Sequence, residues 1–281
     1  MCEPTVVQKP SGAVSPAAVV HPSAQIAEGV EIGPYAIIGP GCEIGPGCWI
    51  GPHAVLEHAT LGEGVRIHPH ASVGTPPQDL KFKGENTRVY VGKNTVIREC
   101  VTVNRGTSAS GRTVVGEGCL IMAYAHVAHD CVVGRNVIMA NSATLAGHVE
   151  IGDGVVMGGL CAVHQFTRIG AGAMIGAASM VAQDVAPFCT THGDRAVIVG
   201  LNAVGLRRAG LPRETLSALK EAYRIFFLSG LTLEEAARRM EGRVLAPQVG
   251  MFVDFLKASK RGICRPRPSG GGDPLSSEAD G

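Results

Sequence analysis

Two histidines and a carboxylate stand close together in the stretch AYAHVAHDCVVG, residues 123–134. His126 and His129 lie three residues apart, and Asp130 and Cys131 follow directly. Neutral imidazoles of this kind can ligate a metal ion, or one imidazole can act as a general base that a carboxylate orients. These twelve residues leave both chemistries open, because each requires its own backbone to bring the side chains together.

An apolar residue recurs at every sixth position of the surrounding chain. The register contains Val115, Ile121, Val127, Val133, Met139, Leu145, Ile151, Met157, Val163, Ile169, Ile175 and Val181. Only 45% of the chain is apolar, so this unbroken run is a real pattern. An α-helix would scatter these side chains over three faces, and a flat strand would carry a weakening Gly or Pro in every repeat. The period predicts a chain that turns a corner every six residues, with three sides to a coil, stacked as a parallel β-helix.

Two polar segments interrupt the period, at 75–87 and 104–113. We expect them to be loops on a rigid scaffold, where functional residues are often found. The period ends after about residue 187, and from 212 onward the pattern is helical. Helices are expected over 212–230, over 232–240 and over 249–261, and Thr232 and Glu235 have the spacing of a capping box at the start of the second.

The sequence therefore predicts a mainly β protein with a small C-terminal α-helical domain. The expected parts are a flexible N-terminus (1–17), the β-helix (18–200), the helical domain (201–263) and a disordered tail (264–281).

Bulk composition excludes several classes of function. Lys and Arg number 25 against 24 Asp and Glu, so the net charge of +1 gives no attraction to nucleic acid or a membrane surface. Nine cysteines without a C-x-x-C pair are typical of buried free thiols rather than of a disulfide framework or a four-cysteine zinc site. No basic start precedes an apolar run and no 18-residue apolar stretch occurs, which predicts a soluble, cytoplasmic protein without membrane insertion.

Stacked coils bring distant residues together. In a coil of 18 residues, positions 18 apart lie one above the other at roughly 4.8 Å, which places His129, Gly147 and Gln165 in one column. His148 and His164 are each within one residue of that column. One corner should thus collect His126, His129, Asp130, His148, His164 and Gln165.

This cluster has three readings. Zinc catalysis would need three converging imidazoles and an open position. His53 and His58 have the spacing of five seen in hexapeptide-repeat carbonic anhydrases, but they lie where the repeat slips. In an acyl transfer, Asp130 would orient His129 as the base, the Gly147 N–H would face the oxyanion, and a substrate hydroxyl or amine would attack, since no G-x-S-x-G nucleophile is present. In the third reading the histidines are structural and the β-helix is an assembly platform. We expect no metal.

A run of motifs carries a family resemblance over about residues 18–263. The segments are QDLKFKGE, IRECVTVNRGT, AHVAHDC, NSATLAGHVEIGD, AVHQF, VAQDVAPF and GLNAVGLRRAGL. Their order and spacing resemble UDP-N-acetylglucosamine 3-O-acyltransferases, which begin lipid A biosynthesis. The resemblance implies a left-handed β-helix, an exception to the usual crossover rule, in a homotrimer with active sites between subunits. It also implies transfer of an (R)-3-hydroxyacyl group from acyl carrier protein to the glucosamine 3-hydroxyl. No tightly bound cofactor is implied, because the phosphopantetheine arrives on the carrier protein.

The resemblance also implies roles for individual residues. His129 is the general base, Asp130 its partner, and Gly147 the oxyanion donor. The residues implied to bind substrate are His126, His148, His164 and Gln165 in the sugar and acyl pocket, Gln78, Asp79 and Lys81 at the nucleotide sugar, and Asn202 and Arg208 at the nucleotide or the phosphopantetheine arm.

The chain departs from the family pattern at four positions. Val204 stands in place of a Glu, Ala209 in place of an Arg, and Arg195 in place of a common His. Ala177 stands where a Gly in some members leaves room for a long acyl chain, so we expect a shorter preferred chain. Some proteins resembling this family use a 3-amino sugar nucleotide, and an amine acceptor stays open beside the hydroxyl.

Overall fold

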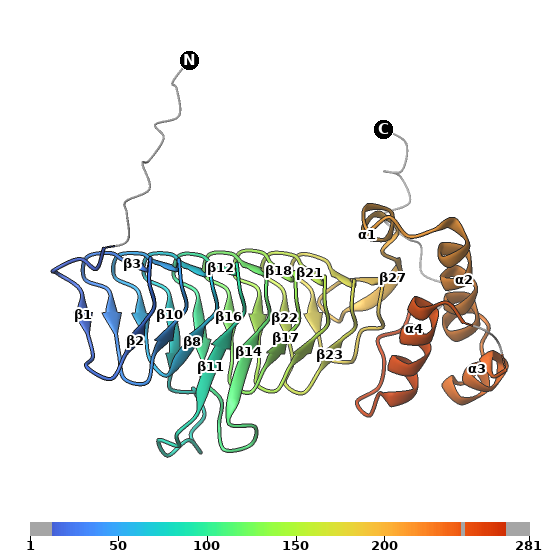
Figure 1. Ribbon diagram of the computed structural model, residues 1–281. Helices are drawn as coiled ribbons and strands as arrows, with labels where there is room; N and C mark the ends of the chain where they lie inside the picture. The colour runs from blue at the N-terminus through green and yellow to red at the C-terminus, as the bar shows by residue number, and fades with distance from the viewer. Residues whose placement is uncertain (1–12, 243–244, 268–281) are drawn as a thin grey trace.

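The computed structural model describes residues 13–242 and 245–267, which form a prism of short strands with helices at its C-terminal end (Figure 1). Residues 1–12 of the expected flexible N-terminus and residues 268–281 of the expected tail lie outside the described residues.

Three sheets form the sides of the prism, and each coil adds one strand to each sheet. The first sheet contains β1 (Val19–Val20), β4 (Ile37–Ile38), β7 (Val55–Leu56), β10 (Ser72–Thr75), β13 (Thr102–Asn104), β16 (His126–Val127), β19 (Thr144–Leu145), β22 (Ala162–Val163) and β25 (Met180–Val181). The second contains β2 (Gln25–Ile26), β5 (Glu43–Ile44), β8 (Ala59–Leu61), β11 (Arg88–Val91), β14 (Arg112–Val115), β17 (Val132–Val133), β20 (Glu150–Ile151) and β23 (Arg168–Ile169). The third contains β3 (Glu31–Ile32), β6 (Trp49–Ile50), β9 (Arg66–Ile67), β12 (Val96–Ile97), β15 (Leu120–Ile121), β18 (Ile138–Met139), β21 (Val156–Met157), β24 (Met174–Ile175), β26 (Cys189–His192) and β27 (Val197–Leu201).

The register between coils follows from the six-residue period. Parallel partners such as His126 and Thr144 are 18 residues apart. All twelve residues of the repeat from Val115 to Val181 are buried, none more than 3% exposed. Each side therefore fills the interior with this residue and with the one two positions before it, such as Ala125, Cys131 and Val137, which is buried as well. The strand residue between the two faces outward. The last strand departs from this pattern, because β27 turns back and pairs antiparallel with β26, which the period did not predict.

The corners of the prism require a left-handed backbone. Asp130, His148 and Phe166 occupy one corner with φ of 60°, 60° and 63°. Such conformations are uncommon outside glycine, with Asp and His among the more tolerant residues. Because each coil repeats the same bend, the side chains at this position stack from coil to coil.

Helices close the C-terminal end. They are α1 (Ala203–Arg208), α2 (Arg213–Tyr223), a π-helical turn η1 (Arg224–Leu228), α3 (Leu233–Met240) and α4 (Pro247–Ala258). The predicted capping box between Thr232 and Glu235 is confirmed, whereas α1 was not predicted. Phe226 and Phe252 are fully buried with ring centroids 6.0 Å apart and form a small helical core. Within residues 13–242 and 245–267, no helix has the length and apolarity needed to cross a membrane.

Candidate active site

The corner between the first and second sheets, here called the active corner, carries both loops and most of the histidine cluster. The first loop (76–87) joins β10 to β11, and the second loop (105–111) joins β13 to β14 (Figure 1). The next coils place His129 and Asp130, then Gly147 and His148, at the same corner. The β-helix thus brings together groups that lie up to seventy residues apart in sequence.

His129 and Asp130 form a hydrogen-bonded pair. His129 Nδ1 lies 2.8 Å from Asp130 Oδ2, so the carboxylate accepts the Nδ1 proton and leaves Nε2 free to act as a base. Gly147 lies directly over the imidazole ring, because a Cβ at residue 147 would stand 2.6 Å from His129 Cε1 and 2.7 Å from Nε2. Among the described residues the Gly147 N–H finds no acceptor. It is thus available to an oxyanion beside the base.

The second loop holds the carboxylate of Asp130. Thr107 donates to it through its backbone N–H at 3.0 Å and its hydroxyl at 2.7 Å, and Ser110 donates through both groups as well. The Asp130 side chain is fully buried. Burial would raise its pKa, but the hydrogen bonds from Ser110, Thr107 and His129 outweigh burial and lower the pKa to about 2.

Thr107 and Ser110 were missed by the sequence reasoning. Their hydroxyls were visible in the motif NRGTSASGRT, which lies one coil before His129. The place of this motif one coil before His129 was the only signal in the sequence that these hydroxyls could reach Asp130.

Replacing Asp130 by Asn should destabilise the fold in a pH-dependent way. A depressed folded-state pKa contributes stability that is present above the ordinary value of 3.8 and is lost as the pH falls toward about 2. At neutral pH the wild type should therefore have a larger free energy of unfolding than Asp130→Asn. This difference should shrink as the pH falls below 3.8, the ordinary pKa of the carboxyl. Urea unfolding over a pH series measures this, with exposed Asp254→Asn as the control. A difference that stays constant with pH would contradict this assignment.

Two further histidines line the same region. His148 meets His129 edge to face, with ring centroids 5.1 Å apart, and its Nε2 lies 3.7 Å from Asp130 Oδ2. It stacks on Phe166, another residue that the sequence reasoning missed, at 4.5 Å. His126 faces outward from β16 with Nδ1 2.6 Å from Thr102 Oγ1. Burial, and secondarily the nearby His129, lowers the pKa of His126, so this ring is neutral at physiological pH.

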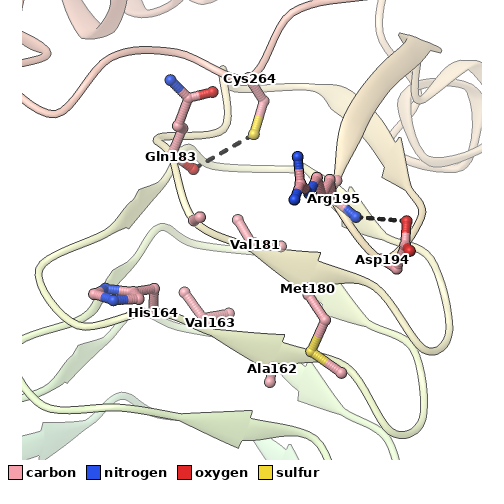
Figure 2. A pocket seen from close by; sticks show the side chains of 11 residues that line it. Ala162, Val163, His164, Met180, Val181, Gln183, Asp194, Arg195 and Cys264 are labelled. Carbon is pink, nitrogen blue, oxygen red and sulfur yellow. Dashed lines mark hydrogen bonds between the residues drawn. The ribbon is translucent and has the colours of Figure 1, made fainter.

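His164 and Gln165 occupy the active corner one coil further on. His164 is exposed, and its Nδ1 lies 2.7 Å from Arg261 Nη2. It lines a pocket of about 500 Å³ with Met180, Gln183 and Arg195 (Figure 2). Arg195, which stands in place of the family's common His, thus lines the same pocket as His164.

The first loop presents the residues expected at the nucleotide sugar. Gln78 and Lys81 are exposed, and Asp79 accepts from the Lys81 N–H at 3.0 Å. Arg105 contacts this loop, because its guanidinium lies 5.3 Å from the Phe82 ring centroid, and it also donates to the carbonyl of Gly74 in β10.

The remaining predicted residues lie at other corners. Asn202 sits at the corner between the second and third sheets, where its side chain donates to the Gly172 carbonyl and caps α1. Arg208, with Val204 and Ala209, is exposed on or beside α1. Ala177 lies between β24 and β25, at the third corner. One chain alone therefore does not bring these groups to His129.

The same side chains could also be considered as ligands of a metal ion. Ligand atoms of His129, Asp130 and His148 lie within 4.8 Å of one another. The Asp130 oxygens already accept from Thr107, Ser110 and His129, so binding a cation there would break this network. His53 and His58 lie on different corners, since β7 separates them. The donor set thus fits a hydrogen-bonded base better than a metal centre.

Cys131 has no arrangement that would activate it. Its thiol is buried and donates to the Ala146 carbonyl, and burial raises its pKa to about 12. A thiolate nucleophile is therefore unavailable at neutral pH.

Comparisons with known proteins identify the class of fold and the family. The family model "Bacterial transferase hexapeptide (six repeats)" matches residues 14–45, 41–75 and 112–147. The model "Udp N-acetylglucosamine O-acyltransferase; Domain 2" matches residues 184–264. The fold and the repeats define a hexapeptide-repeat transferase with a left-handed parallel β-helix, which confirms the predicted fold class.

Relatives in sequence and structure narrow this class. An acyl-(acyl-carrier-protein)–UDP-N-acetylglucosamine O-acyltransferase from an Anaeromyxobacter species is 50% identical over 73% of this chain and 81% of its own length. The structure of LpxA from Acinetobacter baumannii is 41% identical with a TM-score of 0.87, covering 90% of this chain and 99% of that chain. LpxA from Bacteroides fragilis is 40% identical with a TM-score of 0.88, over 90% and 100%. The chain belongs to the UDP-N-acetylglucosamine O-acyltransferase family and is an acyltransferase.

Proposed function

We propose that this enzyme transfers an (R)-3-hydroxyacyl group from acyl carrier protein to the 3-hydroxyl of UDP-N-acetylglucosamine, the first step of lipid A biosynthesis. The observation that carries the proposal is the His129–Asp130 pair beneath the N–H of Gly147, which has no acceptor within residues 13–242 and 245–267. The names of the relatives indicate the donor and the acceptor, and the geometry supports the roles proposed for these residues.

The reaction follows from this geometry. His129 Nε2 removes the proton of the acceptor hydroxyl as its oxygen attacks the thioester carbonyl. Asp130, held ionised by Thr107 and Ser110, stabilises the imidazolium that forms. The Gly147 N–H donates to the carbonyl oxygen as it becomes an oxyanion. When the intermediate collapses, the C–S bond breaks and the imidazolium returns its proton to the leaving thiolate of phosphopantetheine.

The substrates meet groups around this centre. Gln78, Asp79 and Lys81 on the first loop contact the nucleotide sugar, and Arg105 sets the position of that loop. His126, His148, His164 and Gln165 line the space for the sugar and the acyl group. Ala177 limits the acyl chain, and Asn202 and Arg208 contact the nucleotide or the carrier arm. No tightly bound cofactor takes part.

A homotrimer completes the site. Asn202 and Ala177 lie at different corners from His129 within one chain, so a shared substrate would reach them from a neighbouring copy. The outward face of the third sheet also carries an apolar stripe, half-buried in the single chain. Its residues are Val96, Leu120, Ile138, Val156 and Met174. Such a stripe suits contact with another subunit.

A product assay tests the proposal. Purified protein with UDP-N-acetylglucosamine and 3-hydroxyacyl carrier protein should yield a nucleotide sugar heavier by one acyl group, as an ester that hydroxylamine cleaves. The rate should withstand dialysis against a chelator, because Asp130 is already occupied by hydroxyl donors. Absence of the acylated sugar would refute the proposal. Activity that is lost on chelation and restored by zinc would favour the lyase reading, and preference for a 3-amino acceptor would favour amide formation.

A further inference from the structure

The segment 259–264, here called the C-terminal strap, leaves α4 and returns to the prism beside the active corner. Ser259 donates to Asp184 Oδ2 at 2.8 Å, and Asp184 donates its N–H to the Gly262 carbonyl at 2.9 Å. Cys264 donates its N–H back to the Asp184 carbonyl at 2.8 Å. Asp184 is 1% exposed. The strap is thus held on both sides of residue 261 by a buried anchor.

We propose that Arg261 is a positioning residue that fixes the tautomer of His164 and so gives the pocket a hydrogen-bond donor. Arg261 Nε donates to the Ala182 carbonyl at 3.0 Å, which aims the guanidinium, and Nη2 lies 2.7 Å from His164 Nδ1. This role for His164 rests on the proposed function, since it assumes that substrate enters the pocket lined by His164.

The tautomer follows from the chemistry of the guanidinium. Arginine stays protonated and has no acceptor, so a contact of 2.7 Å requires His164 Nδ1 to be the acceptor. The ring proton must then sit on Nε2. The Gln165 carbonyl lies 3.2 Å from the same Nδ1, but a proton on Nδ1 would face the nearer guanidinium, which excludes that arrangement.

An Nε2–H donor defines what His164 can bind. It recognises an acceptor oxygen, such as a carbonyl or phosphate oxygen of the substrate, whereas the Nδ1 lone pair is occupied by the contact with Arg261. His164 is therefore a fixed donor, which separates its role from that of the base His129. The C-terminal strap thereby links the helical region to the active corner.

Spectroscopy tests the tautomer without relying on activity. In protein labelled with 15N-histidine, long-range proton–nitrogen correlations should show His164 protonated at Nε2 at a pH above its titration range, with the signals assigned by their loss in His164→Gln. Arg261→Gln should produce a mixture of both tautomers. Arg265→Gln, the same change at the exposed arginine directly after the strap, should leave the spectrum unchanged. An Nδ1-protonated His164 in the wild type, or a spectrum unaffected by Arg261→Gln, would overturn the proposal.

A double-mutant cycle tests the link to catalysis. Arg261→Gln should lower kcat/KM about tenfold, the scale of one lost charge-assisted hydrogen bond. In a His164→Gln background the same change should cost less than about twofold, because Arg261 acts through that ring. Additive losses that follow the melting temperature would mean a structural role only and would overturn the proposal. Failure to find any acyl transfer would refute the proposed function, while the tautomer measurement would still decide the role of Arg261.

Discussion

His129→Ala should lower kcat by at least ~100-fold, the loss expected when a general base is removed. The remaining site is left intact, because Asp130 keeps its hydrogen bonds from Thr107 and Ser110. The His129 side chain is partly exposed and contributes nothing to the apolar interior of the prism, so the melting temperature should change little. Steady-state kinetics and circular dichroism on the same preparation measure both quantities.

A matched control is available for this variant. His53 is also a corner histidine, but it stacks between Tyr35 and His70 away from the active corner. His53→Ala should leave kcat unchanged. A His129→Ala enzyme that retains more than about a tenth of the wild-type rate would show that another group removes the proton.

Gly147→Ala should cost a rate factor on the order of 100, the effect of misplacing a catalytic group by about 1 Å. A Cβ at this position would stand 2.6 Å from the His129 ring, a distance that carbon atoms do not tolerate. Because Gly147 is not among the residues with positive φ, its backbone accepts alanine without strain. The ring of His129 must therefore move, away from both Asp130 and the acceptor.

A glycine-to-alanine change at another position distinguishes the clash with His129 from the effect of replacing a glycine in general. A Cβ added to Gly250 in α4 meets nothing within 4 Å, so Gly250→Ala should leave the rate unchanged. The Gly147→Ala variant should lose kcat while its melting temperature falls by only a few degrees. Full activity in Gly147→Ala would contradict the placement of the base beneath this glycine.

Much of the site was predictable because the coil is regular. The spacing of 18 predicts Gly147 over His129, and in the structure this glycine lies against the His129 ring. The same spacing places His148 between Asp130 and Phe166. The period also predicted one of the two residues per side that fill the interior. The second, two positions earlier in each repeat, is buried as well, as Val137 and Val149 show.

The contacts that the sequence did not predict join residues whose separation is not set by the 18-residue coil. The second loop interrupts the coil, so Thr107 and Asp130 are in contact although they are 23 residues apart, which is not a multiple of the six-residue repeat. Arg261 reaches His164 across 97 residues after the chain has passed through four α-helices. Asn202 sits at another corner because β27 turns back antiparallel before α1. Each case depends on tertiary packing that no local pattern encodes.

The most direct test of His129 as the base is a structure of the enzyme with UDP-N-acetylglucosamine bound. The 3-hydroxyl of the sugar should lie within about 3.2 Å of His129 Nε2, the reach of a general base, with the Gly147 N–H facing the space where the thioester carbonyl enters. A 3-hydroxyl hydrogen-bonded instead to His126 or His164, with His129 facing away from it, would contradict the account.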